Sequence, residues 1–342
     1  MVADVEPPGA PVVTVIVATY NQSASLQLAL QSILDQDYPD FEVWVVGDGC
    51  TDDSAAAVAS LSDARLQWIN LGHNAGSQFA PNNAGLQRAR GRYIAYLGHD
   101  DLWLPWHLSV LVDCIEATGA DFVHALGASI GPSGPAWVIG PPADGTSYGN
   151  AFMPPCSWLH RREIIDTVGL WRDPHRLPWP TDFDFHRRAF LAGKSFAFSA
   201  RLGVLKFPAG AFRLYAAAGQ MPQRPYVQRL KDAPEALERQ ILADTALALA
   251  RHLSWWEWQL PLKMGTKMFL RALLRYVSRE DHPLRIPEVP VRLLLDAVGL
   301  PHLWPLAVDR QAGSNRWLMP AYLRWHYRRS FRDNRRERGL PT

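Results

Sequence analysis

The chain has 342 residues, of which 48% are hydrophobic and 20% are charged, and its formal net charge is only +2. A chain of this length can bury a large core, and so small a net charge provides no overall electrostatic field for binding nucleic acid. Three cysteines, Cys50, Cys114 and Cys156, lie far apart without the spacing of metal ligands. This sparse, odd set predicts free thiols in a reducing compartment and argues against a disulfide framework.

The sequence also predicts a cytoplasmic location. Residues 1–12 carry acidic residues and prolines, whereas a signal peptide has basic residues followed by an apolar run. No apolar segment of the sequence approaches the ~20 residues that a membrane-spanning helix needs. We therefore expect a cytoplasmic protein, with a peripheral position on the inner face of the membrane left open.

Strands and helices are predicted to alternate along the amino-terminal part of the chain. Apolar runs that indicate strands buried on both faces span residues 12–18, 41–46, 66–71 and 93–97. Helical patterns lie between them at residues 25–35, 54–61 and 86–89, the last after a long loop at residues 72–85. This alternation predicts an α/β fold with a mostly parallel, doubly wound sheet and flanking helices.

Polar residues and carboxylates follow three of the predicted strands. Thr19 and Asn21 follow the first strand, Asp48 follows the second and Asp100 follows the fourth. Because the carboxyl ends of parallel strands share one edge of a sheet, we expect these groups to converge on one cleft. The alternative for Asp100 and the adjacent Asp101 is a polar turn that caps the following helix.

The first strand is not followed by the G-x-G-x-x-G pattern of dinucleotide-binding proteins. Backbone groups are therefore not expected to hold a pyrophosphate in this protein, and a nicotinamide-dependent dehydrogenase is disfavoured. A site that binds a diphosphate without such a loop needs a cation. The hard carboxylate oxygens of Asp100 suit magnesium or manganese.

Two segments of the chain resemble the nucleotide-sugar half of the family 2 glycosyltransferases, which have the GT-A fold. They are VTVIVATYNQSASLQLALQSILDQDYPDFEVWVVGDGCTDDS, residues 13–54, and NAGSQFAPNNAGLQRARGRYIAYLGHDDLWLP, residues 74–105. The whole resemblance covers roughly residues 11–215. It implies a hexosyltransferase-like enzyme that moves a sugar from a nucleotide-diphosphate donor to an acceptor hydroxyl with inversion.

The resemblance assigns the donor side of the site to residues at the strand ends. Thr19, Tyr20 and Asn21 resemble the segment that lines the nucleoside pocket, and Asp48 resembles the carboxylate that reads the edge of the base. Asn83 falls at the polar start of a helix, where the resemblance implies a contact with the donor. The alternative for these residues is ordinary turn chemistry at the ends of strands, with capping for Asn83.

The metal motif of the family is usually Asp-x-Asp, and this chain has Gly98, His99 and Asp100 in its place. Asp100 retains the last carboxylate, which the resemblance implies is the direct ligand of a divalent cation, manganese or magnesium. The first carboxylate is missing at Gly98, and His99 is a candidate to supply a donor contact instead. The alternative for His99 is an ordinary loop residue.

The segment WPTDFDFHRRAFLAGK resembles the Glu-Asp-x-Asp segment on the acceptor side of the family. Thr181 replaces the Glu, and Asp182 retains the Asp that acts as general base. Asp184 is expected to orient a neighbouring group or to cap a helix. Farther along, the chain has Arg213 and Tyr215 where the family commonly has Arg-x-His. Arg213 is a candidate to bind phosphate, with a surface ion pair as the alternative.

These residues predict a metal-dependent displacement at the anomeric carbon. Asp182 would take the proton of the incoming hydroxyl, and a cation held by Asp100 would neutralise the departing diphosphate. The expected acceptor is a glycan or a lipid-linked glycan in polysaccharide or glycolipid synthesis. The alternative is a non-catalytic nucleotide-sugar or glycan-binding module, because Gly98 and Tyr215 replace polar groups of the family. Retention of Asp100 and Asp182 argues against that alternative.

Three regions are predicted along the chain. They are an N-terminal tail, residues 1–10; a GT-A catalytic domain, residues 11–223, with a nucleotide-sugar half, 11–105, and an acceptor half, 106–223; and a C-terminal helical region, residues 224–342. The last region ends in residues 316–342, which contain eight arginines and two acidic residues. Interleaved aromatic residues and arginines predict a helix that binds an anionic membrane surface. The alternative is a helical cap packed on the catalytic domain.

Overall fold

The computed structural model describes residues 9–132, 134–141, 148–150, 153–177, 179–208 and 221–248. The chain divides into two compact units, residues 1–246 and residues 247–342, and every described strand belongs to the first unit. Arg213, Tyr215 and the basic aromatic tail at residues 316–342 lie outside the described residues. Within the described ranges, no helix combines the length and the apolar character that crossing a bilayer requires.

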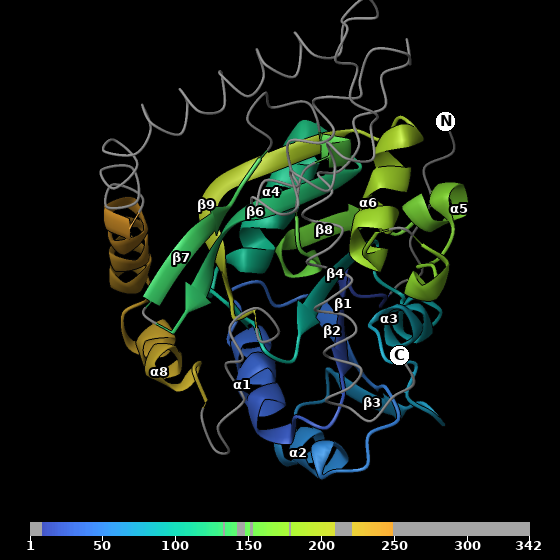
Figure 1. The fold of residues 1–342 in the computed structure, drawn as a ribbon, viewed down its shortest axis with the longest axis horizontal. Helices are drawn as coiled ribbons and strands as arrows, with labels where there is room; N and C mark the ends of the chain where they lie inside the picture. Colours follow the sequence, from blue (N-terminus) through green and yellow to red (C-terminus); the bar gives the residue numbers. More distant parts are fainter. Residues whose placement is uncertain are drawn as a thin grey trace, which may run out of the picture. The chain divides into compact units, whose positions relative to one another are not determined.

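Four parallel strands make up the amino-terminal half of the sheet (Figure 1). In spatial order they are β3 (Leu66–Asn70), β2 (Phe41–Gly47), β1 (Val13–Thr19) and β4 (Tyr93–Gly98). Each strand begins and ends within one residue of its predicted bounds. The apolar runs form buried strands because a parallel sheet covered by helices needs apolar side chains on both faces.

The remaining strands make the second half of the sheet mixed. They are β8 (Trp158–Arg161), β6 (Phe122–Gly131), β9 (Phe196–Lys206), β5 (Leu102–Trp103) and β7 (Gly134–Ile139). β8 joins the two halves by pairing antiparallel with both β4 and β6, and β9 runs parallel to β6. β5 pairs antiparallel with β9, and β7 pairs antiparallel with β6. The predicted α/β fold with flanking helices is confirmed, and the antiparallel pairings make the sheet mixed.

Helices cover both faces of the sheet. One face carries α1 (Ser23–Leu34), α2 (Ser54–Ser60) and α4 (His107–Thr118), and the other carries α3 (Phe79–Leu86), α5 (Ile164–Val168) and α6 (Thr181–Leu191) (Figure 1). Side chains alternate along a strand, so Val15 of β1 joins the apolar cluster of α1 whereas Ile16 joins that of α3. Short 3₁₀ helices span Tyr148–Asn150, Pro155–Ser157 and Pro174–Arg176.

The helix before β4 differs from the prediction. The sequence predicts a loop at residues 72–85 and a helix at 86–89, whereas α3 occupies the second half of that loop and ends where the predicted helix starts. Pro81 lies in the first turn of α3, where its missing N–H needs no partner. Gly85 lets α3 approach β1, because a Cβ there would lie 2.6 Å from Cγ2 of Ile16. Close packing at a glycine thus stabilises a helix whose own sequence is rich in turn-forming residues.

Two helical segments after β9 pack against the last strands of the sheet. They are α8 (Arg224–Asp232) and residues 234–248. Their apolar side chains share a cluster with Leu205 of β9, and they are Leu230, Leu237 and Ile241. The first compact unit therefore includes helices that the sequence assigns to the C-terminal helical region, residues 224–342.

Four histidines are buried in the core, with 0% or 1% exposed surface: His107, His124, His160 and His186. Neither ring nitrogen of His107 or of His124 has a hydrogen-bond partner among the described residues. Burial lowers the pKa of His107 and His186 to about 3 and that of His124 and His160 to about 4. All four rings are therefore neutral in the folded protein at neutral pH.

The buried histidines predict a loss of stability in mild acid. Below about pH 6.5 the unfolded chain binds protons at these residues, whereas the folded chain does not bind them until about pH 4 at His124 and His160 and about pH 3 at His107 and His186. As the pH falls through this window, each histidine therefore lowers the free energy of unfolding by up to about 1.4 kcal/mol per pH unit. Above about pH 6.5 this loss is absent and the stability is at its full value. Circular dichroism during an acid titration measures the midpoint of unfolding.

Replacement of one buried histidine tests this cause. His107→Leu removes two buried nitrogens without partners in the described chain and one titrating group, so the midpoint of acid unfolding should move to lower pH. His73→Leu, at an exposed position, is the control and should leave the midpoint unchanged. An acid midpoint in His107→Leu equal to that of the wild type would mean that another group controls acid unfolding.

Candidate functional site

The carboxyl ends of β1, β2 and β4 lie side by side. Thr19 of β1 pairs with Gly47 of β2, and Ala18 of β1 pairs with Gly98 of β4. The backbone N–H of Asp48 donates to the carbonyl of Thr19 over 2.8 Å. The loops that follow the three strands therefore leave the sheet at one edge, as the sequence predicts. This carboxyl edge is the candidate site.

Asn21 holds together the loops that follow β1 and β2. Its Oδ1 accepts from the backbone N–H groups of Thr51 at 2.8 Å and Asp52 at 3.3 Å, and its Nδ2 donates to the Thr51 hydroxyl at 3.1 Å. Its φ is 47°, in the left-handed region that asparagine tolerates better than most residues. The structure places Thr19, Tyr20 and Asn21 at the predicted edge, and their contact with a nucleoside stays a prediction.

Asp48 is buried, with 4% exposed surface, and both of its carboxylate oxygens accept backbone hydrogen bonds. Oδ1 accepts from the N–H of Ala75 at 2.9 Å, and Oδ2 accepts from the N–H of Gly76 at 3.0 Å. Gly49 permits this close approach: its φ is +72°, and a Cβ there would lie 2.7 Å from the backbone nitrogen of Asn74. Asp48 thus holds the loop before α3 at the carboxyl edge, and its reading of a base edge stays a prediction.

The loop after β4 carries glycine where the Asp-x-Asp pattern has its first carboxylate, and a side chain there would require the Asp100 side chain to move. A Cβ at Gly98 would lie 2.7 Å from Oδ1 of Asp100. His99 and Asp100 are both partly exposed, and Nε2 of Gln223 donates to the backbone carbonyl of Asp100 at 2.8 Å. The residue that precedes α8 therefore fixes the backbone of the predicted metal ligand.

Asp101 is buried and forms an ion pair that the sequence did not predict. Its Oδ2 lies 3.1 Å from Nζ of Lys206, and its Oδ1 accepts from the N–H of Phe207 at 2.9 Å. Burial alone would lower the pKa of Lys206, but Asp101, Cys156 and Asp100 raise it overall, so the ammonium stays charged. The sequence does contain a feature that points to Lys206, because this lysine is the one charged residue of the apolar stretch GVLKF.

Asp182 lies in the first turn of α6, and its Oδ1 accepts from the N–H of Phe183 at 2.8 Å. Burial raises the pKa of Asp182, while the Phe183 N–H and the positive charge of Lys206 oppose the shift. Lys206 interacts electrostatically with Asp100 as well. The predicted metal ligand and the predicted base thus belong to one electrostatic group around Lys206, although 82 positions separate them in the sequence.

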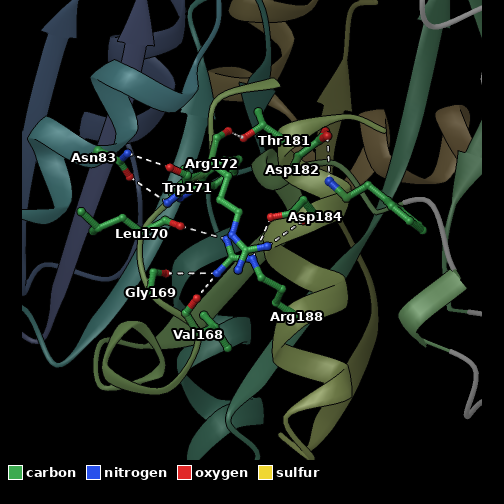
Figure 2. Close-up of polar contacts among 11 residues, drawn as sticks. Asn83, Val168, Gly169, Leu170, Trp171, Arg172, Thr181, Asp182, Asp184 and Arg188 are labelled. Carbon is green, nitrogen blue, oxygen red and sulfur yellow. Dashed lines mark hydrogen bonds and ion pairs between the residues drawn. The ribbon is translucent and has the colours of Figure 1, made fainter. Parts of the chain in front are cut away.

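A network of hydrogen bonds holds the segment between α5 and α6 (Figure 2). The guanidinium of Arg188 donates to the carbonyls of Val168 and Leu170, the latter at 2.9 Å, and pairs with Asp184 at 2.7 Å. Asp184 is buried and also lies 3.8 Å from Arg172. The carboxylate of Asp184 therefore pairs with two arginines and orients Arg188, which holds this segment.

Asn83 of α3 bonds to the same segment (Figure 2). Its Nδ2 donates to the carbonyl of Trp171 at 2.9 Å, and its Oδ1 accepts from the N–H of Trp171 at 2.9 Å. One residue farther along, the carbonyl of Arg172 accepts from the Thr181 hydroxyl at 2.6 Å. These bonds link α3, in the predicted nucleotide-sugar half of the chain, to the helix that carries the predicted base. Contact between Asn83 and a donor stays a prediction.

Asp100 is the candidate metal ligand of the carboxyl edge. Among the described residues, no three His, Cys, Asp or Glu side chains are grouped so that they could hold a metal ion. Magnesium is usually bound through one or two carboxylates together with substrate phosphates and water. The single carboxylate of Asp100 therefore fits a divalent cation that shares its ligands with a diphosphate, and it does not fit a cation held by the protein alone.

Known proteins resemble the amino-terminal part of the chain. Residues 14–169 match the sequence model of the family described as Glycosyl transferase family 2. The succinoglycan biosynthesis protein ExoO of Rhizobium meliloti is 40% identical over 110 residues, 32% of this chain and 31% of that protein. The UDP-Glc:alpha-D-GlcNAc-diphosphoundecaprenol beta-1,3-glucosyltransferase WfaP of Escherichia coli is 30% identical over 113 residues, 33% of this chain and 45% of that protein. The chain thus matches less than half of the length of these relatives.

A solved structure resembles the chain over most of its length. S. aureus TarS 1-349 superposes with a TM-score of 0.52 at 22% sequence identity, over 95% of this chain and 91% of the TarS chain. At this level of identity the likeness shows a shared fold. The matched family and the shared fold agree with the fold class that the sequence predicts.

Proposed function

We propose a reaction from one premise: the chain belongs to glycosyl transferase family 2 through residues 14–169. The proposed reaction moves a sugar from a nucleotide-diphosphate donor to an acceptor hydroxyl, with inversion at the anomeric carbon. The observation that carries the proposal is the grouping of Asp100 and Asp182 around the charge of Lys206. Asp100 lies in the predicted nucleotide-sugar half and Asp182 lies in the predicted acceptor half. This arrangement suits a donor bound by the first half and an acceptor bound by the second.

Asp182 is the proposed general base. The acceptor oxygen forms a bond to the anomeric carbon, the bond from that carbon to the diphosphate oxygen breaks, and the hydroxyl proton passes to the Asp182 carboxylate. The electron pair of the broken bond leaves with the diphosphate. Attack from the face opposite the leaving group inverts the anomeric centre in a single step. The raised pKa of Asp182 makes it a stronger base than an exposed carboxylate.

The proposed donor site lies along the carboxyl edge. Thr19, Asn21 and Asp48 hold the loops at the ends of β1 and β2, where we place the nucleoside. Asp100 would hold a divalent cation, manganese or magnesium, next to the diphosphate. When bound, such a cation neutralises the charge that develops on the departing diphosphate.

The proposed acceptor is a lipid-linked glycan. The name of E. coli WfaP specifies UDP-Glc as its donor and a diphosphoundecaprenol-linked GlcNAc as its acceptor. The name of ExoO specifies succinoglycan biosynthesis. We therefore propose a hexosyl donor, and a role in polysaccharide or glycolipid synthesis at the cytoplasmic face of the membrane.

A non-catalytic nucleotide-sugar binding module is the second candidate function. Gly98 favours it, because the loop after β4 lacks the first carboxylate of the Asp-x-Asp pattern. Such a module does not need a carboxylate of raised pKa on its acceptor side, which Asp182 provides. Turnover therefore distinguishes the two candidates, whereas nucleotide binding alone does not.

Incubation of the full chain with UDP-glucose, Mn²⁺ and α-D-GlcNAc-diphosphoundecaprenol tests the proposed reaction. We expect release of UDP and a β-linked product, which the anomeric coupling constant in the proton spectrum identifies. Other UDP-sugars and GDP-sugars, offered in parallel, identify the donor. Nucleotide binding without turnover across this panel would favour the binding module, and absence of both binding and turnover would contradict the proposed function.

A further inference from the structure

Lys206, at the end of β9, is a charged residue that the reaction as described does not use. Its Nζ lies 3.1 Å from Oδ2 of Asp101, and this contact occupies one of the three N–H donors of the ammonium. The Asp101 side chain is 2% exposed, whereas the Lys206 side chain is 22% exposed. Solvent therefore reaches the Lys206 side of the ion pair but not the Asp101 side.

Stability alone gives little reason for this ion pair. Buried ion pairs stabilise a fold little compared with apolar side chains of similar volume, because desolvation of the two charges offsets their attraction. Residues near Lys206 along the chain are apolar and buried, and they are Leu202, Val204, Leu205 and Phe207. An apolar pair would suit this position at least as well, so the charges indicate a role at the carboxyl edge.

The carboxyl edge needs positive charge to bind a diphosphate. Asp100, Asp101 and Asp182 bring three carboxylates, and all three interact with the charge of Lys206. Glycine at position 98 removes the second carboxylate that would strengthen cation binding. A cation supplied by the protein itself would compensate, and a lysine ammonium binds phosphate as a point charge.

We propose that Lys206 donates hydrogen bonds to the diphosphate of the donor and so binds the leaving group together with the cation at Asp100. Asp101 holds the ammonium in place, because its other oxygen is itself fixed by the N–H of Phe207 at 2.9 Å. This inference rests on the proposed function and adds a donor-binding residue to it.

A paired substitution separates ligand binding from folding. Lys206→Met alone would leave Asp101 buried without its partner, which is strongly destabilising. Asp101→Asn combined with Lys206→Met removes both charges, keeps an oxygen that can accept from the N–H of Phe207, and replaces the lysine stem by a side chain of similar length. Lys206→Arg retains the charge and serves as the rescue variant.

The ion pair between Glu42 and Arg90 provides a matched control. Nη2 of Arg90 lies 2.7 Å from Oε2 of Glu42, which is buried near the amino end of β2. Asp48 follows the opposite end of the same strand. Glu42→Gln combined with Arg90→Met therefore removes a comparable pair away from the carboxyl edge.

Calorimetric titration of each variant tests the inference. The ligands are UDP, uridine and inorganic pyrophosphate, each with and without Mn²⁺. If the wild type prefers guanine nucleotides, GDP and guanosine replace UDP and uridine. We expect the Asp101→Asn/Lys206→Met protein to bind UDP and pyrophosphate roughly 10- to 100-fold more weakly, the range expected for a hydrogen bond to a charged group. Uridine, which lacks phosphate, should bind unchanged. Lys206→Arg should retain most of the affinity, and the Glu42→Gln/Arg90→Met control should bind all three probes as the wild type does.

Two results would overturn the inference. Wild-type affinity for UDP and pyrophosphate in Asp101→Asn/Lys206→Met would leave Lys206 as a partner of Asp101 only. Equal weakening of uridine binding would place the damage in the folding of the carboxyl edge. A wild-type protein that binds neither UDP nor GDP would instead overturn the proposed function, which is a different outcome from loss of binding in the variant alone.

Discussion

Asp182→Asn should lower kcat by about 100- to 10,000-fold, because a positioned general base contributes that much to the rate of proton transfer. The affinity for the nucleotide should stay at the wild-type value, since Asp182 acts on the acceptor hydroxyl and does not hold the donor. Asparagine keeps an oxygen that can accept from the N–H of Phe183, so the first turn of α6 should be preserved. Steady-state kinetics together with calorimetric titration separate the two effects.

The pH dependence of kcat provides a second measurement on Asp182. Burial raises the pKa of Asp182, opposed by the Phe183 N–H and the charge of Lys206. The base works only when it is ionised, so kcat should fall as the pH drops below this raised value, at a higher pH than the ordinary Asp pKa of about 3.9. The residual rate of Asp182→Asn should lack this acid limb.

Asp184→Asn is the matched control, because the two carboxylates lie two residues apart on α6. Asp184 pairs with Arg188 and Arg172 in the network before the helix. Its neutralisation should lower the free energy of unfolding by about 3 kcal/mol, since it leaves a largely buried guanidinium without its partner. Its effect on kcat should stay below about tenfold. A small loss of kcat in Asp182→Asn beside a large one in Asp184→Asn would move the base to Asp184.

The carboxyl edge could be predicted because its signals are local. β1, β2 and β4 are apolar runs, and each is followed directly by polar residues. The rule that parallel strands share a carboxyl edge then brings Asp48 and Asp100 to the same edge without any knowledge of distances. The predicted GT-A fold is confirmed for the same reason, since alternating strands and helices determine how the first half of the sheet forms.

Contacts between distant segments could not be predicted. Asp101 and Lys206 are 105 residues apart, and Asn83 and Trp171 are 88 residues apart. No periodic pattern in the sequence predicts contacts between such distant residues. The contact of Lys206 depends on the path of β9, and the contact of Trp171 depends on the path of the segment before α6. Asn83 illustrates the result: a polar residue at an expected helix start suggests a cap or a donor contact, and the structure uses both of its polar atoms on Trp171.

Asp100→Ala should lower kcat/KM by about 100-fold or more in Mn²⁺, because charge stabilisation by a bound metal is worth several kcal/mol in the transition state. The substitution should weaken UDP binding in Mn²⁺ and leave UDP binding in chelator nearly unchanged. The reason is that Asp100 is the carboxylate that remains of the Asp-x-Asp pattern, so its removal takes away the protein ligand proposed for the cation.

His99→Ala is the control for Asp100→Ala, because it alters the neighbouring side chain and keeps the carboxylate. It should reduce kcat/KM less than Asp100→Ala does, and the dependence on Mn²⁺ should persist. Activity measured over a range of Mn²⁺ concentrations distinguishes the two variants, since loss of a metal ligand raises the concentration that gives half-maximal activity. Full activity of Asp100→Ala in both Mn²⁺ and chelator would remove Asp100 from the site, and the ammonium of Lys206 would then be a candidate to neutralise the diphosphate without a metal.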